Sequence, residues 1–368
     1  MDLVNFLRSN TASSYHRSLA VPEAIDALRK KYPVSAKHDS EYPELVCFHY
    51  TYIPQHLKRD PILNQCRGIV LNSQDDWNIV SYPYDKHYNY GEPEAANIDP
   101  NTMRVYEKLD GSLMTLYCYK GNWRVSSSSV ANASGKCNTG LIFSNLFERA
   151  WNYEGYPNKN RLDSNYCYMF ELCTNDNRVV LEHPYDKLVL HGVRNLVTLR
   201  EVDPLVAARQ YGFKTPKIFS GSDMKELARF VDTIGDIEGF VVVDANFNRN
   251  KMKTEAYLKL HHTATSRGSN LYEMILKAVQ HRNTDEWLAK FPMHTEICNK
   301  IEKQFEQILN DVCDTYGRFE EKNKKNFALN IKDHQYKRFL FSIYNSQCDP
   351  ETYMRTVSVL DLMPYFKL

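Results

Sequence analysis

The sequence predicts an α+β protein in two parts: a mostly antiparallel sheet domain over residues 1–262, followed by an all-helical domain over residues 263–368. Up to about residue 262, short runs rich in Val, Ile, Tyr, Phe and Cys alternate with turn residues, a pattern typical of strands. After residue 266 the apolar residues recur at helical spacing. At roughly 150 residues per domain, 368 residues also suit two domains.

The strands of the first part are predicted where β-branched and aromatic residues gather between turns. A few helices interrupt them: Val21–Lys31, which Pro22 begins, and Ser222–Asp232, with Ser222 as its N-cap. The predicted strands are Leu45–Tyr52, Gly68–Asn72, Ser112–Tyr119, Trp123–Ser127, Tyr166–Thr174, Lys187–Val193 and Gly239–Asp244.

The second part shows apolar stripes with a period near 3.6 and almost no alternation with a period of two. This pattern argues against an OB-fold, which needs five strands in this region. The residues that form the stripes are Leu271, Ile275 and Val279, then Ile297, Ile301, Phe305 and Ile308, then Phe339 and Ile343.

Composition excludes several classes of protein. No stretch approaches the roughly 18 apolar residues of a membrane span, and the N-terminus lacks an export signal, so we expect a soluble, cytoplasmic protein. The nine cysteines include no C-x-x-C pair, which disfavours a disulfide framework or a zinc knuckle. With 46 basic and 45 acidic residues, any nucleic acid must be held by a local basic surface.

The most informative segment is Glu107–Ser112, at the junction between an extended run and a predicted strand. It contains Lys108, followed by Asp110 and Gly111. A lysine that attacks a phosphate needs such a turn, because glycine lets the backbone approach the phosphate and nearby amides stabilise developing negative charge. By itself, the segment also fits a tight turn with a solvated lysine.

Further charged residues follow in order. Glu171 lies between apolar neighbours in a predicted strand, where a carboxylate is costly unless it binds something. Glu238 and Gly239 stand at the head of a buried strand, and Lys251 and Lys253 share one face of an extended segment. Each of these alone fits a structural role, but together they predict a site for nucleotidyl transfer.

These residues resemble the motifs of the covalent nucleotidyltransferase superfamily, which contains ATP-dependent DNA and RNA ligases and mRNA capping enzymes. The resemblance is strongest to the phage-type RNA ligase 1 family and covers roughly residues 45–262. Three further segments match that family: Cys66–Val70 around Arg67, Lys86–Asn89, and Asn177–Val180.

The resemblance implies an adenylyltransferase domain over 1–262 and a helical RNA-specificity domain over 263–368. It implies an ATP-dependent ligase that joins the 5′-phosphate and 3′-hydroxyl ends of single-stranded RNA, such as nicked tRNA. The intermediates would be lysyl-AMP and an adenylylated RNA end. The implied cofactors are ATP and Mg²⁺ or Mn²⁺, a separate end-healing kinase/phosphatase is an expected partner, and we expect a monomer.

The resemblance also implies roles for individual residues. Lys108 is the nucleophile, and Lys251 and Lys253 assist it; neighbouring cations favour the neutral amine, which only about 1 in 2,500 free lysines carries at pH 7. The implied ATP-binding residues are Arg67, Lys86, Tyr88, Gly111, Glu171, Gly239, Lys251 and Lys253. Glu238 and Glu171 would hold the metal.

The tail carries a candidate RNA surface. Residues 318–338 hold seven basic and three acidic residues with interleaved aromatics, which suits phosphate tracking, although a solvated helix face explains it equally well. The predicted RNA-binding residues are Lys322, Lys324 and Lys325, together with Tyr257 in the first part.

Two departures from the family stand out. The family commonly has a cation where this chain has Ser126–Ser129, so one phosphate contact is either missing or supplied by Arg124 or Lys136. In the Lys86–Asn89 segment, His87 replaces an aromatic residue. The alternatives are an mRNA guanylyltransferase or a DNA ligase with the same lysine chemistry, both of which normally carry an OB-fold, or a catalytically silent RNA-binding module.

Overall fold

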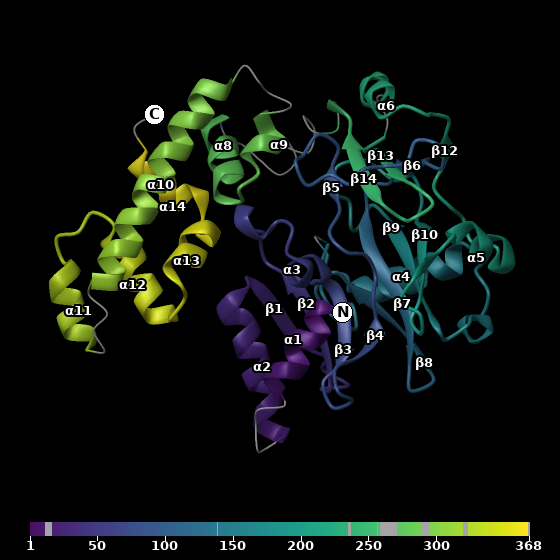
Figure 1. Cartoon of the computed structure of the whole chain (residues 1–368), viewed down its shortest axis with the longest axis horizontal. Helices are drawn as coiled ribbons and strands as arrows, with labels where there is room; N and C mark the ends of the chain where they lie inside the picture. The colour runs from purple at the N-terminus through teal and green to yellow at the C-terminus, as the bar shows by residue number, and fades with distance from the viewer. Residues whose placement is uncertain are drawn as a thin grey trace. The chain divides into compact units, whose positions relative to one another are not determined.

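The computed structural model describes residues 1–11, 17–137, 139–234, 237–255, 257, 271–288, 294–318 and 323–366 (Figure 1). The chain divides into two compact units, Met1–Ala264 and Thr265–Leu368. The first unit contains three sheets and the second is helical, which confirms the predicted fold class.

The first sheet of the N-terminal unit has the strand order β1-β2-β3-β4, and every neighbouring pair is antiparallel. Helices α1, α2 and α3 share a hydrophobic core with it. Helix α2 begins at Arg17, so Pro22 lies inside the helix and does not begin it as predicted. The bounds are β1 Val34–His38, β2 Leu45–Tyr50, β3 Arg67–Asn72, β4 Asn78–Ser81, α1 Asp2–Thr11, α2 Arg17–Lys31 and α3 Pro61–Gln65.

The second sheet has the order β11-β10-β9-β7-β8 and is also antiparallel. Helix α4 buries Leu146, Phe147, Ala150 and Trp151 in the core that it shares with this sheet. The bounds are β7 Ser112–Tyr119, β8 Asn122–Ser127, β9 Tyr166–Cys173, β10 Lys187–Asn195, β11 Glu201–Val202, α4 Phe143–Tyr153 and α5 Pro204–Tyr211.

The third sheet has the order β12-β6-β13-β14-β5, in which only the β14–β5 pair is parallel. Helix α6 is capped by Asp223, whose side chain accepts from two backbone N–H groups, and not by Ser222 as predicted. The bounds are β5 Tyr88–Asn89, β6 Arg104–Lys108, β12 Ile218–Phe219, β13 Gly239–Val243, β14 Arg249–Lys253 and α6 Met224–Phe230.

The C-terminal unit packs its helices around a core that contains Ile275, Ile301, Phe305, Phe339 and Ile343, all from the predicted stripes. No strand occurs in the described part of residues 271–366. The helices are α8 Leu271–Gln280, α9 Thr284–Leu288, α10 Thr295–Arg318, α11 Lys324–Ile331, α12 Lys337–Ser346, α13 Pro350–Thr356 and α14 Val359–Leu362.

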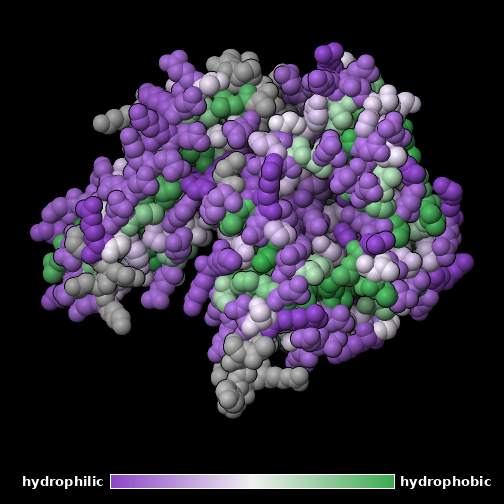
Figure 2. Space-filling model, in the orientation of Figure 1, coloured by the Kyte–Doolittle hydropathy of each residue, from purple (hydrophilic) through white to green (hydrophobic). Residues whose placement is uncertain are grey.

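The surface is consistent with the composition. Figure 2 shows a face on which hydrophilic residues predominate and apolar residues form scattered groups. Within the described residues, no helix combines the length and the apolar character that crossing a membrane requires.

Candidate active site

The predicted lysines meet on one face of the third sheet. Lys108, the last residue of β6, is opposite Gly239 of β13, and Gly239 is opposite Lys253 of β14. Lys108, Gly239 and Lys253 thus form one row across β6, β13 and β14. Because alternate residues of a strand share a face, the two rows that lie two and four residues further along the strands point to the same side of the sheet. These rows are Tyr106, Val241 and Lys251, then Arg104, Val243 and Arg249. The cations of β6 and β14 therefore line one surface, on either side of β13.

Two glycines allow the strands to approach at this point. Gly239 has a φ of +154°, and a Cβ there would lie 1.9 Å from the carbonyl oxygen of Met252. A Cβ on Gly111 would lie 2.5 Å from the carbonyl oxygen of Leu172. Both positions exclude a side chain because of contacts within the protein. Their predicted contact with ATP stays a prediction.

A buried glutamate joins the two lysines of the first row. Glu238 Oε2 lies 2.6 Å from Lys108 Nζ, and Oε1 lies 3.1 Å from Lys253 Nζ. The Glu238 side chain is 5% exposed, whereas those of Lys108 and Lys253 are 21% and 19% exposed. The carboxylate therefore fixes both amines from beneath and leaves them accessible from the pocket.

Asp110 of the nucleophile turn holds its own loop together. Its Oδ2 accepts from the backbone N–H groups of Val180 (2.9 Å) and Leu181 (2.6 Å), and its Oδ1 accepts from the Tyr257 hydroxyl (2.7 Å). Burial, together with Glu238 and Asp110, raises the pKa of Tyr257. Tyr257 is 2% exposed and lies in the core beside the turn. Contrary to the prediction that it binds RNA, it does not lie on a surface that RNA could contact.

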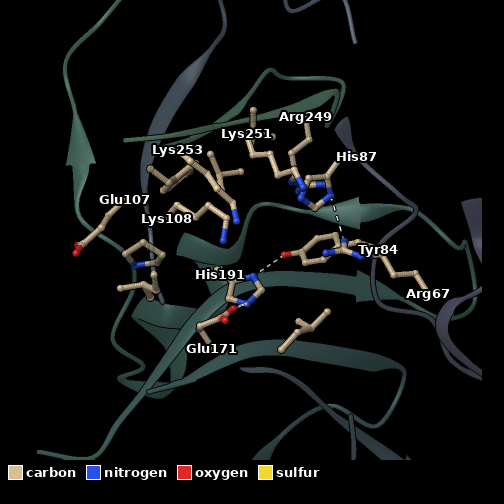
Figure 3. Close-up of a pocket in the computed structure, with 16 residues that line it drawn as sticks. Arg67, Tyr84, His87, Glu107, Lys108, Glu171, His191, Arg249, Lys251 and Lys253 are labelled. Carbon is tan, nitrogen blue, oxygen red and sulfur yellow. Dashed lines mark hydrogen bonds and ion pairs between the residues drawn. The ribbon is translucent and has the colours of Figure 1, made fainter. Parts of the chain in front are cut away.

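A pocket opens over the row of lysines (Figure 3). Lys108, Lys251 and Lys253 point into the same space, whereas the carboxylate of Glu107 points away from them. Apolar side chains, including Leu113 and Val241, line part of the wall. The other lining residues that carry polar groups are Arg67, Tyr84, His87, Tyr106, Glu171, His191 and Arg249.

Glu171, the carboxylate predicted to lie in a strand, is linked through His191 to Tyr84 in the pocket wall. Glu171 Oε2 is 3.3 Å from His191 Nε2, and the Tyr84 hydroxyl is 2.9 Å from His191 Nδ1 (Figure 3). Burial raises the pKa of Tyr84. A Cβ on Gly192 would lie 1.8 Å from the Tyr84 hydroxyl oxygen, so the glycine in the irregular part of β10 makes room for the tyrosine.

In the Lys86–Asn89 segment, Lys86 and Tyr88 lie against each other. The Lys86 ammonium lies over the rings of Tyr50 (5.6 Å) and Tyr88 (5.5 Å). Tyr88 is 7% exposed, and its hydroxyl donates to Asn64 Oδ1 and to the Lys58 carbonyl oxygen. Neither Lys86 nor Tyr88 lines the pocket. Tyr88 is therefore a packing residue beneath Lys86, and the role of both in ATP binding stays a prediction.

Arg124 does not replace the cation that is absent from the serine run. Asp39 and Glu41 hold its guanidinium at 3.0 Å and 2.6 Å, and it does not line the pocket. The serine run instead packs against Gly68, where a Cβ would lie 3.0 Å from Ser128 Cα. The serines thus adjoin Arg67, the neighbour of Gly68 in the sequence.

The carboxylates fit a divalent metal only in part. Among the described residues, no group of three or more His, Cys, Asp or Glu side chains is arranged to hold a metal ion. Glu171 lines the pocket, and both oxygens of Glu238 face ammonium groups. Mg²⁺ accepts one or two carboxylates when substrate phosphates and water complete its shell. The donors therefore suit a metal that arrives with a triphosphate.

The remaining predicted residues belong to the tail. Lys324 and Lys325 are exposed at the start of α11, where Asn323 caps the helix. Lys322 lies outside the described residues.

Sequence reasoning missed four polar pocket residues: Tyr84, Tyr106, His191 and Arg249. One signal was available, because Arg249 extends the alternation of Lys251 and Lys253 by one step. Nothing in the local sequence marks Tyr84 or His191, which meet only through the tertiary fold.

Comparisons with known proteins show the family of the chain. A family described as RNA ligase matches residues 65–260, more than half of the chain. An RNA ligase of Rhodothermus phage RM378 is 26% identical over 88% of this chain and 90% of its own length. A predicted bifunctional polynucleotide kinase/RNA ligase of Autographa californica nuclear polyhedrosis virus is 27% identical over 73% of this chain, but over only 40% of its own length.

The fold and the lysine row thus define a nucleotidyltransferase-type enzyme. The chain belongs to the phage-type RNA ligase family, which confirms the family that the motifs indicated. Among solved structures, an archaeal ATP-dependent RNA ligase is similar at 11% identity, with a TM-score of 0.46 and 84% of each chain covered.

Proposed function

We propose that this chain seals single-stranded RNA with ATP through a covalent Lys108–AMP intermediate. The observation that carries the proposal is the row in which Lys108, Gly239 and Lys253 stand opposite one another over Glu238. It presents the accessible Lys108 amine, fixed by a carboxylate and adjoined by further cations, at the floor of a pocket.

In the first step the Lys108 ammonium gives up a proton, and the lone pair of the resulting amine forms a bond to the α-phosphorus of ATP; a second proton leaves the nitrogen for water as the phosphoramidate forms. The bond from that phosphorus to the bridging oxygen breaks, and pyrophosphate leaves with the electron pair. Glu238 Oε2, at 2.6 Å, is placed to accept the proton, which then passes to water. Lys251 and Lys253 offset negative charge on the phosphates as it develops.

The next two steps use the same pocket. A 5′-phosphate oxygen of RNA attacks the phosphorus of the bound AMP and breaks the nitrogen–phosphorus bond, so the Lys108 amine takes a proton back. A 3′-hydroxyl then attacks the 5′-phosphorus, AMP leaves and the hydroxyl proton is released. A divalent metal held by Glu171 and Glu238 would supply positive charge to the phosphates.

Labelling with α-³²P ATP and Mg²⁺ tests this proposal. The wild-type chain should become covalently labelled, EDTA should prevent labelling, and Lys108→Ala should abolish it. Lys225→Ala, an exposed lysine of the same unit, is the matched control and should be labelled as the wild type is. A labelled Lys108→Ala variant would disprove the assignment of the nucleophile.

The alternative of an mRNA guanylyltransferase predicts labelling by GTP in place of ATP. It is the weaker candidate because the described residues after Lys253 form helices and not the strands of an OB-fold. Comparing ATP with GTP in the same assay separates the two.

We assign RNA selection to the helical residues after 262 and adenylylation to residues 1–262. The proposed substrate is single-stranded RNA or nicked tRNA. Since sealing needs a 5′-phosphate, a kinase must supply it where ends lack one. The viral relative that combines a kinase with a ligase supports this pairing.

A further inference from the structure

Arg67 differs in its partners from two arginines of the third sheet: Arg249, which lines the same pocket, and Arg104, which does not. Arg249 contacts the Glu201 carboxylate at 2.8 Å, and Arg104 contacts Asp203 at 2.7 Å. In the described part of the chain, no carboxylate lies within ion-pair distance of Arg67. Its guanidinium therefore keeps its full positive charge for a ligand.

Neutral acceptors orient this guanidinium. Arg67 Nη1 lies 3.2 Å from His87 Nδ1 and 3.5 Å from the Asp85 carbonyl oxygen. Because an arginine can only donate, His87 Nδ1 is the acceptor, and the imidazole proton is on Nε2. His87 lines the pocket, and its ring stands edge-on to Tyr84, 6.2 Å between centroids.

The surroundings keep this imidazole neutral. Burial, then the charges of Arg67, Arg249, Lys251 and Lys86, hold the pKa of His87 well below its ordinary value. A protonated imidazole could not accept the Arg67 hydrogen bond and would repel the guanidinium.

We propose that His87 is a positioning residue, which orients the Arg67 guanidinium toward the phosphates of the bound nucleotide without cancelling its charge. The inference rests on the proposed function. A carboxylate at this position would orient Arg67 but neutralise it, and an aromatic hydrocarbon ring would accept no hydrogen bond. A neutral acceptor satisfies both requirements.

Four single variants test the idea, with the rate of adduct formation measured against ATP concentration. His87→Phe should raise the KM for ATP roughly tenfold, because Arg67 loses its acceptor. His87→Asn, whose Oδ1 can take the place of Nδ1, should recover most of this loss. His87→Asp should do no better than His87→Phe, because it neutralises Arg67. His38→Phe, an exposed histidine, is the control and should match the wild type.

A double-mutant cycle shows whether His87 acts through Arg67. In an Arg67→Ala background, His87→Phe should change the KM by less than about twofold, since its target is gone. If the phenylalanine variant does not fold, His87→Gln takes its place, because its longer side chain moves the polar group away from the Nδ1 position. His87→Gln should then raise the KM for ATP roughly tenfold by itself and less than about twofold in the Arg67→Ala background.

Three results would overturn the inference: an unchanged KM in His87→Phe, the full tenfold effect in the Arg67→Ala background, or a His87→Asn variant as impaired as His87→Phe. Each presupposes a labelled wild-type chain. A wild-type chain that takes no label instead refutes the proposed function.

Discussion

Two glutamates in the first unit are each surrounded by two cations, and the two clusters differ in what the cations can do. Glu238 contacts Lys108 and Lys253, at 2.6 Å and 3.1 Å. Glu201 contacts Arg194 and Arg249, at 3.2 Å and 2.8 Å. The arginine side chains are 8% and 10% exposed, about half as much as the lysines.

The charge count is the same in both clusters, so charge alone does not define the reactive site. An arginine stays protonated and binds a carboxylate through a planar fork, which suits a scaffold. A lysine can lose its proton and become a nucleophile. The Glu201 cluster is therefore expected to stabilise the fold around the pocket, and the Glu238 cluster to perform the chemistry within it.

The largest effect is expected when Lys108 is made like the arginines of the other cluster. Lys108→Arg should keep the ion pair with Glu238 and the native fold but form no adduct, a loss of more than about 10³-fold, because a guanidinium cannot deprotonate near neutral pH. The variant should still seal RNA that is supplied already adenylylated. Gel labelling measures the first property, and a detectable adduct would contradict the comparison.

Replacing the glutamate of the lysine cluster should have the next largest effect. Glu238→Gln keeps the shape but removes the charge that fixes both amines and the acceptor for the Lys108 proton. Adduct formation should slow by roughly 10²-fold while circular dichroism stays native. A variant that labels faster than the wild type would show that Glu238 only restrains the amine.

The corresponding change in the arginine cluster should affect stability. Glu201→Gln leaves two guanidinium groups facing a neutral amide, and breaking a buried pair of this kind costs about 3 kcal/mol or more. Thermal unfolding should therefore occur at a lower temperature, while adduct formation per folded molecule changes only a few-fold. Equal losses in stability for Glu201→Gln and Glu238→Gln would remove the distinction between the clusters.

The smallest effect on the chemistry is expected in the helical tail. Changing Lys322, Lys324 and Lys325 to Glu should weaken RNA binding and lower its salt dependence by about one unit of slope per lost phosphate contact. Labelling by ATP should be unchanged. Native RNA affinity with a native salt slope would mean that this segment is a solvated face and that RNA is selected elsewhere.

Local patterns predicted much of this structure. All seven predicted strands and the predicted helical stripes occur, because each follows from spacing within a short segment. The alternation of Lys251 and Lys253 likewise predicted that both lie on one face, as the register with Gly239 and Val241 shows.

Contacts between distant segments could not be predicted in this way. The Tyr84–His191 pair joins residues 107 positions apart, and Asp110 binds Tyr257 across 147 positions. In both pairs at least one residue lies outside the strands, and the two meet only through the tertiary fold. Tyr257 is predicted from the sequence as an RNA-binding residue, but it is buried beside the nucleophile turn.

The central claim is that Lys108, and no other lysine of the pocket, carries the nucleotide. The most direct measurement is mass spectrometry of peptides from wild-type protein incubated with ATP and Mg²⁺ and then denatured. We predict one AMP per chain, on the peptide that contains Lys108. AMP on Lys251 or Lys253, or no covalent AMP in a folded protein that still seals RNA, would contradict this mechanism.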